Sequence, residues 1–129
     1  MKLLECTKLW QLLEIAIRDL KIAEQTPNTI INMDIWLSSN TGVCFCCMAG
    51  AVLKQEGYIR CDRADPETWK RMQVIEYLRT GHINNAYTRF YNHTHDDLGD
   101  RWTALYKVDR LAFFRDMEDM LKYLMEKDV

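Results

Sequence analysis

A short polar segment near residue 95 carries the residue types best suited to metal binding or acid–base chemistry. Two histidines flank a threonine, and two aspartates follow directly. Imidazole and carboxylate groups ligate divalent metals, and both can transfer protons. In an extended loop the two imidazoles would point the same way, which suits a shared ion. The candidate metal-binding residues are therefore His93, His95, Asp96 and Asp97, with a capping or surface loop as the alternative.

The cysteines form a second group with metal-ligating chemistry. Three of the five are crowded into one apolar stretch, and zinc prefers thiolate and imidazole ligands. The C-x-C-C spacing lacks the two-residue separation of most zinc ribbons, and cysteine also packs as a small hydrophobic residue. We expect reduced cysteines in a core and no cofactor. The residues weighed as zinc ligands are Cys44, Cys46, Cys47 and Cys61, with His82, His93 and His95.

A third group combines aromatic residues with arginines between residues 87 and 110. Aromatic and arginine side chains concentrate at the energetic centres of protein interfaces, and they also stack on bases. Aspartates lie among these arginines, which favours a protein partner over nucleic acid. The alternative is that Phe90, Trp102 and Tyr106 belong to the core. The predicted partner-binding residues are Tyr87, Arg89, Tyr91, Arg101, Trp102 and Arg110.

Length and composition limit what could position these groups. The chain has 129 residues, the size of one domain spanning 1–129, and 48% of them are apolar. Seventeen basic residues against nineteen acidic ones give a net charge of -2, which disfavours general nucleic-acid binding. Only five glycines and two prolines argue against a sandwich or barrel and favour helices. No apolar run is long enough to span a bilayer, so we expect no membrane contact.

The amino-terminal half is expected to contain two helices. Leu3 to Glu24 has the apolar spacing of an amphipathic helix, which Thr26-Pro27 ends. Ile30 to Leu37 is compatible with a strand, an extended lead-in or one helical turn. Gly42 to Glu56 is apolar on all sides up to Lys54, which predicts a central helix, with a strand as the competing interpretation.

The second half contains clearer start signals. Asp65-Pro66 predicts the N-terminus of a helix that runs to Arg79, with Gly81 as its C-terminal cap. Ile83 to Asn92 is expected to form a short helix. A final helix is expected from Trp102, and most clearly from Asp109, to the end of the chain. Its inward stripe is expected to contain Leu111, Phe114, Met117, Leu121 and Leu124. Together the segments predict an all-α, compact bundle of five or six helices around the apolar helix of Val43 to Leu53.

One stretch is similar to a known group of proteins. Asn32-Met33-Asp34-Ile35-Trp36, followed by Gly42 to Ala51, resembles a segment of small uncharacterised bacteriophage and prophage proteins. There an N-M-x-x-W element precedes a glycine and a run of small residues. Thr41 stands where those proteins usually have cysteine. The resemblance covers about 20 residues and implies a phage-encoded protein acting in the host cytoplasm. The matching positions are Trp36, Gly42, Cys47, Ala49, Gly50 and Ala51.

The function expected from these observations is binding, without catalysis. No glycine-rich phosphate loop, nucleophile elbow or dinucleotide fingerprint is present. Small phage proteins without catalytic motifs often inhibit host or antiviral-defence proteins by occupying their surfaces, and a second copy of the chain is a further candidate partner. Two alternatives stay open: a metal-dependent or nucleotide-directed enzyme using the His93 to Asp97 segment, and a nucleotide-binding sponge.

Overall fold

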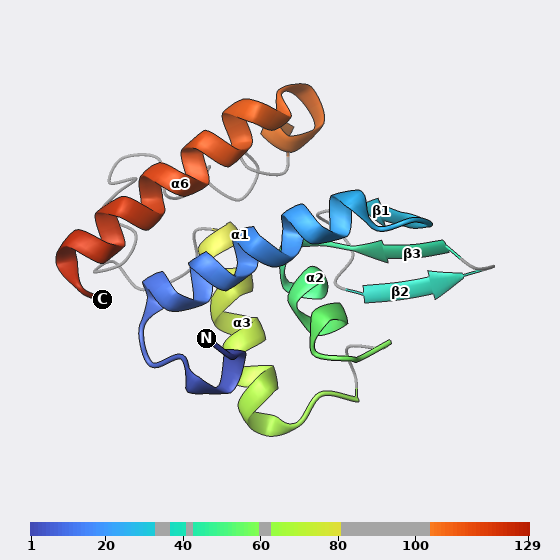
Figure 1. The fold of residues 1–129 in the computed structure, drawn as a ribbon, viewed down its shortest axis with the longest axis horizontal. Helices are drawn as coiled ribbons and strands as arrows, with labels where there is room; N and C mark the ends of the chain where they lie inside the picture. The colour runs from blue at the N-terminus through green and yellow to red at the C-terminus, as the bar shows by residue number, and fades with distance from the viewer. Residues whose placement is uncertain (33–36, 41–42, 60–62, 81–103) are drawn as a thin grey trace.

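The computed structural model describes residues 1–32, 37–40, 43–59, 63–80 and 104–129 (Figure 1). Most of the described residues are helical, and residues 104–108 form a further helical segment before the last helix. The elements in chain order are η1 (Leu3–Glu5), α1 (Leu9–Gln25), β1 (Thr29–Ile31), β2 (Leu37–Asn40), β3 (Val43–Cys46), α2 (Met48–Gln55), α3 (Pro66–Thr80) and α6 (Arg110–Lys127).

A three-stranded sheet corrects the expectation of an all-α fold. Its strand order is β1-β3-β2, with β1 parallel and β2 antiparallel to β3. Phe45 on the central strand is in register with Ile30 on one side and Ser38 on the other. The sequence of Ile30 to Leu37 is compatible with three structures. In the structure, β1 extends into the start of this segment, and β2 begins at its last residue, Leu37. The mostly helical part of the prediction is confirmed.

The segment predicted as one central helix divides at Cys47. Val43–Cys46 forms β3, and the helix α2 begins at Met48. Cys47 has an extended backbone, and its Sγ accepts a hydrogen bond from the Gly50 amide at 3.4 Å, so it caps α2. The helical prediction was therefore wrong for the first half of the segment. Apolar runs of this length lack a decisive period, and β3 pairs with a strand on each side.

Helix α1 occupies the central position that the sequence assigned to the segment of Val43 to Leu53. It contacts α2, α3, α6 and β1, and Leu13, Ala16 and Leu20 on it are fully buried. Its start also differs from the prediction, because Leu3–Glu5 forms the separate turn η1. The amides of Thr7 and Lys8 donate to the side chain of Gln11, at 2.8 and 3.1 Å. These bonds cap α1 at Lys8.

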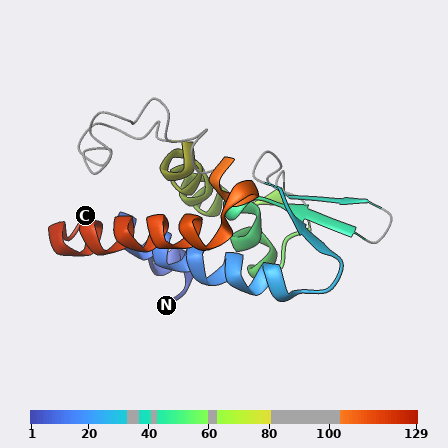
Figure 2. The same ribbon diagram turned by 90° about the horizontal axis from the view of Figure 1, so that it is seen from above.

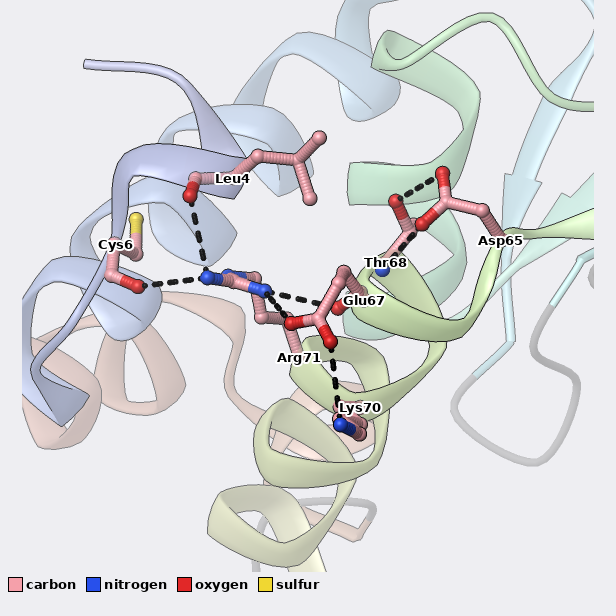
Figure 3. Close-up of polar contacts among 7 residues, drawn as sticks. All are labelled: Leu4, Cys6, Asp65, Glu67, Thr68, Lys70 and Arg71. Atoms are coloured by element: carbon pink, nitrogen blue, oxygen red, sulfur yellow. Dashed lines mark hydrogen bonds and ion pairs between the residues drawn. The ribbon is translucent and has the colours of Figure 1, made fainter.

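Helix α3 starts where the sequence predicted (Figure 3). The Asp65 carboxylate accepts hydrogen bonds from the Thr68 amide at 2.9 Å, the Thr68 hydroxyl at 3.0 Å and the Tyr58 hydroxyl at 3.1 Å. One turn later, the Arg71 guanidinium donates to the carbonyl oxygens of Leu4 and Cys6 at 3.2 and 3.3 Å. Arg71 therefore links α3 to η1 through hydrogen bonds.

The Asp65 cap predicts a pH-dependent stability. The hydrogen bond from the Thr68 amide, with those from two side chains, lowers the pKa of Asp65. A lowered folded-state pKa contributes stability above the unfolded value, and that stability is lost as pH falls through the folded value. Asp65→Ala should therefore lower Tm by several degrees at neutral pH, and its deficit should shrink as the pH falls below the unfolded-state value of about 3.9. Thermal melts of wild type, Asp65→Ala and the non-ionising cap Asp65→Asn measure this; a pH-independent deficit of Asp65→Ala would contradict it.

Candidate interaction surface

Helices α1 and α6 lie side by side and run in opposite directions (Figure 2). The Trp10 amide donates to the Val129 carbonyl at one end, and Glu24 binds Arg110 at the other. Two shallow hollows, of about 400 and 480 Å³, lie between the helices. We call their lining the α1–α6 face. It consists of Glu14, Ile17, Arg18 and Lys21 of α1 with Arg110, Leu111, Phe114, Arg115, Glu118, Leu121, Lys122 and Met125 of α6.

The first hollow combines an aromatic ring with cations and an exposed leucine. Phe114 is only 6% exposed. Lys21 Nζ lies 5.3 Å and Arg110 Cζ 5.4 Å from the centre of its ring. Leu111 stands at the edge of the hollow with 67% of its surface exposed. Arginine beside an exposed apolar side chain is typical of protein interfaces.

The second hollow continues the first toward the C-terminal end of α6. The two share Lys21 and Glu118, which form an ion pair of 3.1 Å across the helices. Ile17 is buried in this hollow, whereas Met125 is 46% exposed. Apolar side chains therefore line both hollows, and the Lys21–Glu118 ion pair is common to the two.

A mostly buried carboxylate, that of Glu24, holds Arg110 at the first hollow. The Glu24 side chain is 11% exposed and binds Arg110 Nε at 2.5 Å and Nη2 at 2.9 Å. The Tyr106 hydroxyl donates to the same carboxylate at 2.8 Å. Burial, and then the neighbouring Glu24 carboxylate, raise the pKa of Tyr106, so its hydroxyl remains a donor. The cluster holds the start of α6 against the end of α1.

Of the six predicted partner-binding residues, Arg110 is the one that lies among the described residues. Its side chain is 53% exposed and lines the first hollow, although it also binds Glu24. Tyr106 is half-buried and packs edge-to-face on Phe113, with ring centres 5.1 Å apart, which agrees with the core interpretation. The other five predicted partner-binding residues, Tyr87, Arg89, Tyr91, Arg101 and Trp102, lie outside the described residues.

The structure does not test the predicted metal site at residues 93–97. All four candidate ligands, His93, His95, Asp96 and Asp97, lie outside the described residues, and so do the possible zinc ligands Cys61 and His82. The same holds for the expected cap Gly81, the expected core residue Phe90 and the predicted helix of 83–92. In the part of the chain that the structure describes, no three His, Cys, Asp or Glu residues are grouped so as to hold a metal. The side chains of Cys46 and Cys47 are fully buried, and burial raises the pKa of Cys46 to about 11. They pack in the core.

The sequence did not predict the α1–α6 face. Leu111 was placed on the inward stripe of the last helix, but it is exposed, while Met117 and Leu124 from the same stripe are fully buried. The apolar stripe of α6 is therefore wider than the surface that α1 covers. Leu111 and Met125 lie fourteen positions apart, close to four helical turns, so they share a side of α6. That spacing is the signal that could have indicated the face.

Among the described helices, none combines the length and apolar character that crossing a bilayer requires. Comparison with protein-family models, with curated proteins and with solved structures found no match to this chain.

Proposed function

We propose that this chain is a phage-encoded, non-enzymatic binding protein. In this proposal it acts in the host cytoplasm, where it inhibits a host or antiviral-defence protein by occupying its surface. The proposed origin rests on the resemblance of the segment around Trp36 and of Gly42 to Ala51 to small phage proteins. The proposed contact surface is the α1–α6 face.

The exposed apolar side chains of this face carry the proposal. Leu111 and Met125 are large hydrophobic residues with 67% and 46% of their surface exposed, and they stand at opposite ends of two joined hollows. Scattered apolar residues are normal on a protein surface, but large exposed apolar side chains grouped along hollows with charged neighbours are typical of a binding site. Burying such side chains in a partner removes apolar surface from water and supplies affinity.

The experiment compares one groove variant with one matched control. Leu111→Asp introduces a charge into the groove, and Ile59→Asp introduces the same charge at a residue that is 74% exposed and does not line either hollow. Each tagged protein is used to capture partners from a lysate of the bacterial host. A partner retained by wild type and Ile59→Asp but lost by Leu111→Asp supports the proposal. Equal retention by all three proteins, or no reproducible partner, would contradict it.

A further inference from the structure

The charges of the α1–α6 face differ in sign from those of the chain as a whole. The complete sequence has a net charge of -2. Of the residues that line the two hollows, five are basic and two are acidic. The basic ones are Arg18, Lys21, Arg110, Arg115 and Lys122, and the acidic ones are Glu14 and Glu118.

Three of the five cations are already paired. Arg18 binds the buried Asp19 at 2.9 Å, Lys21 binds Glu118, and Arg110 binds Glu24. Within the described ranges, Arg115 and Lys122 are exposed and have no ion-pair partner. They lie seven positions apart on α6, about 10 Å along the helix axis. The face therefore offers two cations, two turns apart, to an occupant.

The apolar positions give the length of that occupant. Leu111 and Met125 are separated by about 21 Å along α6. A helix of about fourteen residues spans the same distance, and its apolar stripe would contact Leu111, Phe114 and Met125. Acidic residues beside that stripe, two turns apart, would meet Arg115 and Lys122. A second copy of this chain fits less well, because a two-fold contact would bring the same two cations together.

We infer that the α1–α6 face binds an amphipathic helix of the partner protein, with acidic residues flanking its apolar stripe. This inference rests on the proposed function and specifies the partner's binding element. The apolar contacts supply affinity, whereas the acidic residues pair with Arg115 and Lys122 and set the orientation of the helix.

The test uses synthetic helices in place of the partner. The probe is a fluorescein-labelled, 18-residue amphipathic peptide with a leucine stripe flanked by glutamates, and its counterpart has lysines at the glutamate positions. Wild-type protein should bind the acidic peptide saturably and the basic one at least about tenfold more weakly. Arg115→Glu with Lys122→Glu should weaken binding of the acidic peptide by about tenfold or more. Added salt should weaken it as well.

A second double variant controls for net charge. Arg63→Glu with Lys70→Glu makes the same change at exposed residues that do not line the hollows, and it should leave affinity within about twofold. Equal affinity for both peptides, no loss in the groove variant, self-association through this face, or binding only to phosphatidylglycerol vesicles would overturn the inference. If Leu111→Asp abolishes partner capture but the Arg115 and Lys122 reversals do not weaken it, the helix inference fails and the proposed function stands.

Discussion

Replacing Phe113 with alanine is expected to lower the free energy of unfolding by about 3–5 kcal/mol. The Phe113 side chain is fully buried, and its ring packs edge-to-face against Tyr106 and Phe114, with centres 5.1 and 5.3 Å away. Alanine loses both the apolar transfer energy and the contacts around the resulting cavity. A loss of this size is a large part of the total of about 5–15 kcal/mol for an ordinary domain. Urea unfolding followed by circular dichroism measures it.

A neighbouring exposed residue provides the control for this variant. Val108 is 81% exposed, so Val108→Ala should change the free energy of unfolding by less than about 0.5 kcal/mol. Phe113→Leu keeps most of the apolar volume and should fall between the two. If Phe113→Ala and Val108→Ala had similar effects, Phe113 would not be the centre of the packing between the start of α6 and Tyr106.

The second large effect concerns binding. Leu111→Asp should weaken the affinity for the captured partner by about 30-fold or more, because an apolar contact is lost and a charge is desolvated in the interface. Its stability should stay close to wild type, since Leu111 is mostly exposed in the free protein. Titration calorimetry with the purified partner measures the affinity. An unchanged affinity in a folded Leu111→Asp protein would count against the α1–α6 face.

Local signals predicted the starts of α3 and α6 correctly. Asp65 and Asp109 each precede a helix, and each carboxylate accepts a hydrogen bond from the backbone amide three residues later. The donors are Thr68 for Asp65 and Ala112 for Asp109. Such caps depend on a few neighbouring residues, so a short sequence window contains the information. The division at Cys47 depends instead on β3 pairing with β1 and β2, which lie elsewhere in the sequence. Local periodicity does not contain that information.

The α1–α6 face was harder to predict for a related reason. Leu111 and Leu124 have the same side chain and were placed on the same stripe, but one is 67% exposed and the other is buried. Their difference depends on how α6 is rotated against α1. The Glu24 bonds to Tyr106 and Arg110, and the Lys21–Glu118 pair, join the two helices. These contacts span more than eighty residues of sequence and have no local pattern. The sequence predicted Arg110 as a partner-binding residue because of its residue type. Its position beside the first hollow depends on these contacts between α1 and α6.

We propose that the α1–α6 face contacts the partner. Photo-crosslinking in host cells tests this most directly, with benzoylphenylalanine introduced at Leu111 in one protein and at Ile59 in another. Both positions are exposed in the free protein, and only Leu111 lines the groove. We predict a specific covalent adduct with the partner from position 111 and none from position 59. An adduct from position 59 alone, or equal adducts from both positions, would contradict the claim.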